Sequence, residues 1–190
     1  MEVFDKPATR SAARPLTREE YQALGTAGIL GSDVELLWGV IVKKMSKSPL
    51  HVTVVRQLFS KLSAKLLPDF FLLKEDPIGI ENSEPEPDIA IVRGDVDDYT
   101  AAHPETAELV IEVALTSLEM DREKASLYAT AEVPEYWIVN VEEEIVEIHT
   151  EPSGEGYRTV NRVKAGESMN VRCCEGLNLE VAQIFAFKQG

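Results

Sequence analysis

The chain has 190 residues and carries a net charge of −14 at pH 7. This length suits one domain with a sizeable core, and the hydrophobic content of 44% is ordinary for a globular protein. No apolar run approaches the roughly 18–20 residues that a membrane span needs, and the polar start does not resemble a secretory signal. The sequence therefore predicts a cytoplasmic protein, with a flexible N-terminal arm at residues 1–14 and a single folded domain at residues 15–190. Cys173 and Cys174 are adjacent, which disfavours a disulfide between them and predicts reduced thiols.

The charge is distributed unevenly along the chain. The window from Lys43 to Lys65 contains six basic residues and no acidic one, so the rest of the chain carries −20 once these six charges are subtracted from −14. Lys61 and Lys65 are four residues apart in a predicted helix and would share one face. Such a window could attract phosphate to one end of an acidic molecule, or it could be an ordinary solvated helix face. Its basic residues are Lys43, Lys44, Lys47, Arg56, Lys61 and Lys65.

Two helix starts are marked by capping residues. Thr17 can cap a first helix, and Glu20 completes a capping box. Ser48 followed by Pro49 marks the start of a second helix. In this second helix apolar residues recur every four positions until Pro68, which predicts an amphipathic helix about four turns long. The apolar stripe consists of Leu50, Val54, Leu58, Leu62 and Leu66.

Strands dominate the remaining sequence. Residues 88–92 and 109–114 are nearly continuous apolar runs, as expected for strands covered on both faces. Residues 144–150 and 157–163 alternate apolar and polar positions, which indicates antiparallel edge strands with one face in water. The whole pattern predicts an α/β fold with a mixed central sheet flanked by helices and with antiparallel strands at the C-terminal end. The other expected elements are a hairpin or bulge around Gly39, strands at 70–74 and 135–141, and helices at 121–131 and 181–187.

Asp88 and Glu112 interrupt two of the apolar runs with carboxylates. A carboxylate in a buried strand is costly unless it pairs with a cation or binds a metal. The two residues are 24 positions apart (112 − 88), enough for neighbouring strands, which lie about 4.8 Å apart. They could therefore share one divalent cation, with hard oxygen ligands favouring Mg²⁺, Mn²⁺ or Ca²⁺ over zinc. The alternative is a structural salt bridge or a partly exposed edge position.

A longer series of motifs resembles the Uma-type family of predicted bacterial restriction endonucleases, within the PD-(D/E)XK nuclease superfamily. The resemblance covers roughly residues 16–185, and the order of its motifs is far more specific than any one of them. It implies a restriction-endonuclease-like fold and hydrolysis of phosphodiester bonds with Mg²⁺ or Mn²⁺. The motifs are Leu16–Tyr21, Glu35-Leu36, Gly39, Ser48–His51, Pro87-Asp88, Val110–Ala114, Thr116-Ser117, Asp121–Lys124, Tyr128-Ala129 and Val133–Val139.

The resemblance also implies roles for individual residues. Asp88 matches the aspartate of the Pro-Asp motif, and Glu112 matches the glutamate of the (D/E)XK motif. Ala114 stands where the superfamily lysine usually lies, and Lys124 matches a lysine that the family carries on the following helix. Glu35 matches an additional upstream acid.

Two further expectations concern the metal ligands and the lysine. Asp88, Glu112 and the Val113 carbonyl are the expected ligands of the cation. Lys124 follows Asp121 by three residues, where the family often has four. If Asp121 is already helical, this difference of one residue rotates the position of the lysine by about 100° around the helix axis. If the helix begins after the missing residue, the position of the lysine does not change.

The resemblance leaves a second class of function open. The strong negative charge favours a DNA-associated accessory or dimerisation module whose nuclease site is weak or silent. A minor alternative is a metal-dependent hydrolase of small phosphoesters. For the nuclease, we expect DNA as substrate and a homodimer, with Tyr136–Val139 and the strands after it as the interface. The possible nucleic-acid contacts are Lys43, Lys44, Lys47, Lys61, Lys65 and His51, although His51 could instead contact a carboxylate or serve a structural role.

Overall fold

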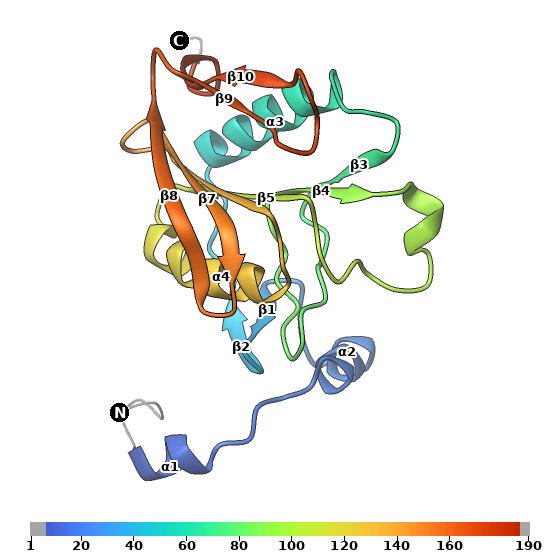
Figure 1. The fold of residues 1–190 in the computed structure, drawn as a ribbon. Helices are drawn as coiled ribbons and strands as arrows, with labels where there is room; N and C mark the ends of the chain where they lie inside the picture. Colours follow the sequence, from blue (N-terminus) through green and yellow to red (C-terminus); the bar gives the residue numbers. More distant parts are fainter. Residues whose placement is uncertain (1–6, 187–190) are drawn as a thin grey trace. The chain divides into compact units, whose positions relative to one another are not determined.

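The computed structural model describes residues 7–186, which divide into two compact units (Figure 1). The first unit contains residues up to Lys44 together with Glu81–Pro85, and the second contains Met45–Ile80 and the chain from Glu86 onward. The range predicted as one nuclease domain, 15–190, includes parts of both units. Within the described residues, no helix is long and apolar enough to cross a membrane.

The first unit contains two helices and a β-hairpin. Thr17 caps the second helix, and the capping box with Glu20 is confirmed. Trp38 and Gly39 form the hairpin turn with φ angles of 50° and 75°, as in the two-residue turns that match the twist of a hairpin. The elements are α1 (Pro7–Ala12), α2 (Arg18–Thr26), β1 (Val34–Leu37) and β2 (Val40–Lys43). Helix α1 lies in the expected arm, of which residues 1–6 are outside the described part of the chain.

Residues 81–85 add a short segment to this unit. Leu36 and Glu84 form a β-bridge, and the Glu84 N–H donates to the Leu36 carbonyl at 2.7 Å. The Glu84 carboxylate accepts a hydrogen bond from Gln22 Nε2 at 2.6 Å. This short segment therefore has buried polar residues that hold it to β1 and α2.

The second unit is built on a six-stranded mixed sheet with the order β3-β4-β5-β6-β7-β8. Strands β5 and β6 are parallel and are connected through α4, while the other neighbouring pairs are antiparallel. The predicted fold class is confirmed. The elements are α3 (Pro49–Ser63), β3 (Phe70–Leu73), β4 (Ile89–Arg93), the 3₁₀ helix η2 (Val96–Tyr99), β5 (Leu109–Ala114), α4 (Leu118–Thr130), β6 (Glu135–Asn140), β7 (Ile145–Ser153), β8 (Gly156–Lys164), β9 (Ser168–Asn170), β10 (Asn178–Glu180) and the 3₁₀ helix η3 (Val181–Gln183).

Helices α3 and α4 cover opposite faces of this sheet (Figure 1). Val54, Leu58 and Leu62 of α3 are completely buried against one face, as the four-residue stripe predicts. The β9–β10 hairpin closes the same core with Met169 and Leu179. Helix α4 packs on the other face, and the residues of β5, β6 and β7 that point there form the polar site described below.

Two strand predictions need correction. Strand β7 is not an edge strand, because it lies between β6 and β8, and Glu147 and His149 on it are buried beneath α4. The alternation of apolar and polar residues in β7 therefore does not mark a solvent-facing side, because these two polar residues are buried and contact other parts of the protein. The Tyr136–Val139 segment, expected at a dimer interface, is completely buried within the sheet, so it cannot present a surface to a second copy.

Two helix predictions also need correction. Helix α3 ends at Ser63, well before Pro68, and the chain then turns toward β3, with the Lys65 N–H donating to the Leu62 carbonyl at 3.1 Å. Lys65 therefore lies in a turn and shares no helix face with Lys61. The helix expected at 181–187 is only the 3₁₀ turn η3, and position 187 is outside the described residues.

Candidate active site

Asp88 and Glu112 meet because their strands pair in register. Ile89 of β4 lies opposite Ile111 of β5, so the residue before β4 lies beside the next residue of β5. The Asp88 N–H lies 3.4 Å from Glu112 Oε2, and Asp88 Oδ2 accepts the Val113 N–H at 2.8 Å. Both acidic residues are only 5% exposed. The structure thus brings together the two carboxylates that the sequence singled out.

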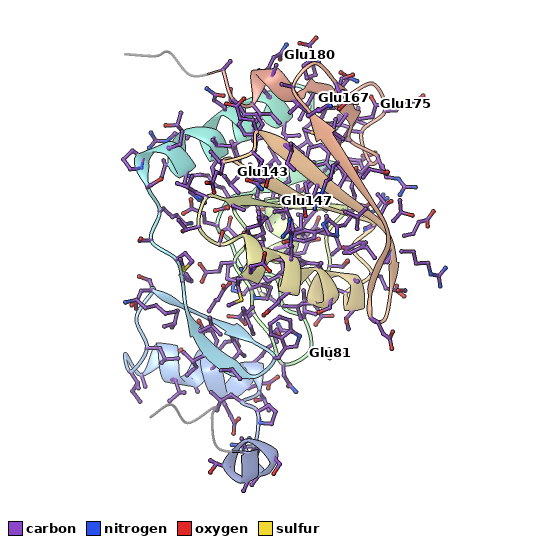
Figure 2. All side chains as sticks on the ribbon, turned by 90° about the vertical axis from the view of Figure 1, so that its left-hand side faces the viewer. Glu81, Glu143, Glu147, Glu167, Glu175 and Glu180 are labelled. Atoms are coloured by element: carbon purple, nitrogen blue, oxygen red, sulfur yellow. The ribbon has the colours of Figure 1, made fainter. Side chains whose placement is uncertain are left out.

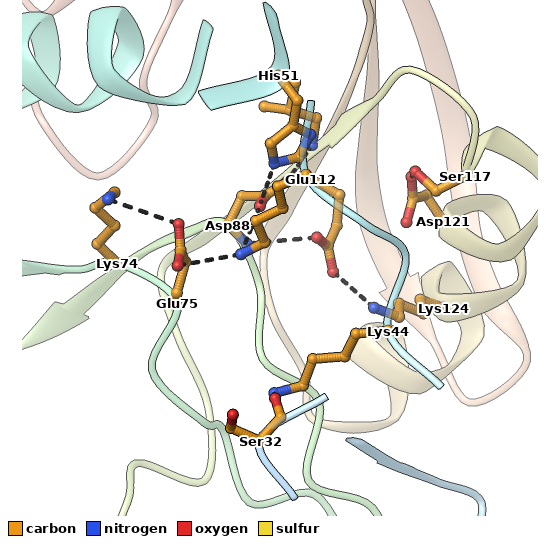
Figure 3. A network of polar contacts seen from close by, with 12 residues as sticks. Ser32, Lys44, His51, Lys74, Glu75, Asp88, Glu112, Ser117, Asp121 and Lys124 are labelled. Atoms are coloured by element: carbon orange, nitrogen blue, oxygen red, sulfur yellow. Dashed lines mark hydrogen bonds and ion pairs between the residues drawn. The ribbon is translucent and has the colours of Figure 1, made fainter. Parts of the chain in front are cut away.

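The other oxygen of Glu112 faces α4 (Figure 3). Lys124 Nζ lies 3.2 Å from Glu112 Oε1, and the Tyr128 hydroxyl donates to the same oxygen at 3.0 Å. Lys124 and Tyr128 are four residues apart, so they project from one face of the helix. Helix α4 begins at Leu118 and already runs at Asp121, yet Lys124 reaches the carboxylate. The three-residue spacing therefore does not remove the lysine from the site.

His51, in the first turn of α3, contacts the other carboxylate. Its Nε2 lies 3.0 Å from Asp88 Oδ1. Burial lowers the pKa of His51, but the hydrogen bond to Asp88 and its charge raise it, and the net direction is upward. The Val113 backbone adds a smaller contribution in the same direction. The contact with Asp88 therefore favours the protonated imidazolium at this position.

A chain of alternating charges extends from Asp88 toward solvent. Lys47 Nζ lies 3.7 Å from Asp88 Oδ1 and 3.2 Å from Glu75 Oε2. Lys74 Nζ lies 3.6 Å from the other oxygen of Glu75 (Figure 3). Glu75 and Lys74 were not singled out from the sequence, because ordinary loop charges carry no signal of what they will face. Lys47 and Lys74 are about one third exposed, so both ammonium groups can reach a bound anion.

The position of α4 is set by polar contacts with β6 and β7. Arg122 forms a fork with Glu147, at 3.2 Å from Nε and 2.7 Å from Nη2 (Figure 2 labels Glu147). The Tyr136 hydroxyl donates to the Asp121 carbonyl at 2.8 Å. Burial, followed by the charge of Glu112, raises the pKa of Tyr136, so the phenol stays a neutral donor. These contacts hold the helix that carries Lys124 over the sheet.

The donor set fits a cation that keeps much of its water. The described residues contain no cluster of three or more His, Cys, Asp or Glu side chains arranged to hold a metal. Asp88 and Glu112 supply two carboxylates, and Mg²⁺ is commonly bound by one or two carboxylates with water and substrate phosphate completing the octahedron. The pair therefore suits Mg²⁺ or Mn²⁺ and does not suit zinc. The Val113 carbonyl, also expected as a ligand, belongs to the residue whose N–H donates to Asp88 Oδ2.

Comparison with known proteins identifies the family. Residues 18–182 match the model of the Uma2 family, described as "Putative restriction endonuclease". The chain belongs to this family. The resemblance inferred from the motifs is confirmed, and membership supports a nuclease function.

The fold agrees with a solved structure that carries a similar description. That structure is of "a putative nuclease belonging to DUF820" from Anabaena variabilis, with a TM-score of 0.67 and 13% sequence identity. The match covers 90% of this chain and 98% of the other. At this identity the likeness shows the fold alone. No match was found among curated proteins.

The remaining predicted residues of this Uma2 chain are divided between the two units. Glu35 is on β1 of the first unit and is 5% exposed, and Lys43 and Lys44 belong to the same unit. In the second unit Lys61 Nζ donates to Gln183 Oε1 at 3.1 Å. Lys61 is ten residues after His51 on α3, or about 15 Å along the helix axis. Within the second unit, the predicted nucleic-acid contacts nearest Asp88 are therefore Lys47 and His51, and Lys61 lies apart from them.

Proposed function

We propose that this Uma2-family protein is a Mg²⁺-dependent endonuclease that hydrolyses DNA phosphodiester bonds at a PD-(D/E)XK-type site. The observation that carries the proposal is the buried pair Asp88 and Glu112, in which Glu112 Oε1 accepts a hydrogen bond from Lys124. Two buried carboxylates side by side are unfavourable unless positive charge offsets them. A fold needs no such pair for stability, whereas a phosphodiesterase needs it to hold a cation.

Asp88 and Glu112 would hold the cation, with the Val113 carbonyl as a further ligand. Such an ion supplies polarisation of the scissile phosphate and a lower pKa for water. Mn²⁺ would serve as well as Mg²⁺, because both accept oxygen ligands.

The chain's own cations would act on the phosphate and on the attacking water. Lys124 would orient the water and offset the negative charge that develops on the phosphate in the transition state. Lys47 and His51 both contact Asp88 Oδ1 and would hold phosphate oxygens through their N–H groups. Glu35 is proposed as the additional acid on the strength of family resemblance.

A second candidate function is a DNA-associated module with a silent site. The observation in its favour is that Lys124, Lys47 and His51 already balance the charge of the two carboxylates in this structure. The net charge of −14 also opposes tight binding to DNA.

Incubation with several nucleic-acid forms separates the two functions. Supercoiled plasmid, linear duplex, single-stranded DNA and RNA are each incubated with Mg²⁺, with Mn²⁺ or with EDTA, beside the Asp88→Ala variant. We expect cation-dependent nicking of DNA by the wild type and none by the variant. Absence of cleavage of every form, or equal cleavage by Asp88→Ala, would contradict the nuclease and favour the silent module.

A further inference from the structure

The two oxygens of Glu112 have different surroundings. Oε1 receives both donors from α4, with Lys124 Nζ at 3.2 Å and the Tyr128 hydroxyl at 3.0 Å. Oε2 faces the Asp88 backbone N–H at the longer distance of 3.4 Å. Oε2 is therefore the oxygen on the side of Asp88, which places it to accept a cation shared with that residue.

Tyr128 is fixed in a way that a lysine is not. It is completely buried, and its ring packs on Tyr136 with centroids 4.9 Å apart. Rotation of a phenol ring about its long axis leaves the hydroxyl in place, so this packing fixes the position of the donor. Lys124 has four rotatable side-chain bonds and carries a charge, so it neutralises Glu112 but defines the carboxylate plane less sharply.

We infer that Tyr128 is a positioning residue, whose hydroxyl holds Glu112 Oε1 and so turns Oε2 toward Asp88 for cation binding. The inference rests on the proposed cation site. Partners behind a metal ligand fix its orientation, and their loss commonly costs 10–100-fold in metal affinity. Tyr128 is neutral, so its removal changes the orientation of Glu112 without changing the charge of the site.

Lys124 provides a contrast on the same oxygen. An ammonium group beside the cation position repels a divalent ion, so replacing Lys124 with Met should tighten Mn²⁺ binding while it impairs cleavage. Tyr128→Phe should weaken Mn²⁺ binding. Loss of the lysine should thus strengthen Mn²⁺ binding and loss of the tyrosine hydroxyl should weaken it, although both groups contact the same oxygen. A general loosening of the site would change the affinity in the same direction in both variants.

The test is calorimetric titration of Mn²⁺ into the wild type, Tyr128→Phe and Tyr157→Phe. Tyr157 is the matched control, because it belongs to the same aromatic group and its hydroxyl donates to the Val133 carbonyl at 2.9 Å, away from both carboxylates. We expect a Kd that is about 10–100-fold weaker in Tyr128→Phe and unchanged in Tyr157→Phe. Thermal unfolding in EDTA checks that both variants are folded to a similar degree.

The possible failures are distinguishable. A wild type that binds no Mn²⁺ would overturn the proposed cation site itself. A wild type that binds, with Tyr128→Phe binding equally well, would overturn the positioning role and leave the cation site standing. An equal loss of affinity in both tyrosine variants would show that the effect is general packing, which also overturns the inference.

Discussion

Replacing Lys124 with Met tests whether the lysine is a structural counter-charge for Glu112. Both side chains are 6% exposed, and Nζ lies 3.2 Å from Oε1. At this separation and an effective dielectric constant of 20, the attraction amounts to about 5 kcal/mol. Methionine is unbranched like lysine and only one atom shorter, so the substitution removes the charged group with little change in volume.

The expected loss of stability is smaller than that attraction. Breaking a buried ion pair by removing one partner costs about 3–5 kcal/mol, because the remaining charge stays buried. Glu112 keeps the Tyr128 hydroxyl as a donor, so we expect the lower end of this range. For a chain of this size, 3 kcal/mol corresponds to roughly 6–12 °C in Tm. In Mn²⁺ the bound cation replaces the missing charge, so the ion should raise the Tm of Lys124→Met more than that of the wild type.

Thermal unfolding in EDTA and in Mn²⁺ measures both effects. Lys164→Met is the matched control, because Lys164 is exposed and its loss should change stability by no more than about 0.5 kcal/mol. If Lys124→Met unfolds within 2 °C of the wild type in EDTA, on the order of 1 kcal/mol or less, the pair is not a buried counter-charge and the assignment of Lys124 fails.

Three further outcomes are expected. Burial lowers the pKa of His149 below its ordinary 6.5, so the unfolded chain binds this proton more tightly and the stability of the fold decreases as the pH drops below 6.5. Between pH 7.5 and 5.5 the Tm of His149→Phe should therefore decrease less than that of the wild type. An equal decrease in both proteins would contradict this. Lys47→Gln should weaken DNA binding and flatten its salt dependence by up to about one unit, because Lys47 is the proposed phosphate contact beside Asp88, whereas an unchanged salt slope would place the DNA path elsewhere. Light scattering should report a dimer, and a mass that stays at the monomer value of 21.1 kDa at every concentration would refute it.

The carboxylate pair could be predicted because it depends on local patterns. Asp88 and Glu112 are exceptions in runs that are otherwise apolar, and the short connection between the runs favours neighbouring strands. A carboxylate partner was one expectation for His51, but that this partner is Asp88, and that Tyr128 contacts Glu112, could not be predicted in the same way. These contacts depend on how α3 and α4 lie across the sheet, and neither residue breaks its own local pattern.

The errors have a common physical cause. In β7, Glu147 and His149 occupy alternate positions that indicate a solvent-facing side, but Arg122 of α4 covers Glu147 and satisfies it with two hydrogen bonds. A buried polar residue with a partner from a distant element cannot be distinguished from an exposed one by periodicity alone. The predicted length of α3 is wrong because Leu66 continues the apolar stripe beyond the end of the helix at Ser63. Leu66 packs on the core from the turn that follows the helix.

The most direct test of the central claim is Mn²⁺ titration of the wild type beside Glu112→Ala. Glu112 is the ligand candidate that faces both Asp88 and the helix carrying Lys124. If these carboxylates form the cation site of a nuclease, calorimetry will show a binding site in the wild type that is lost in Glu112→Ala. Equal Mn²⁺ binding by the two proteins would contradict the claim, and would leave the buried pair as part of a structural charge network.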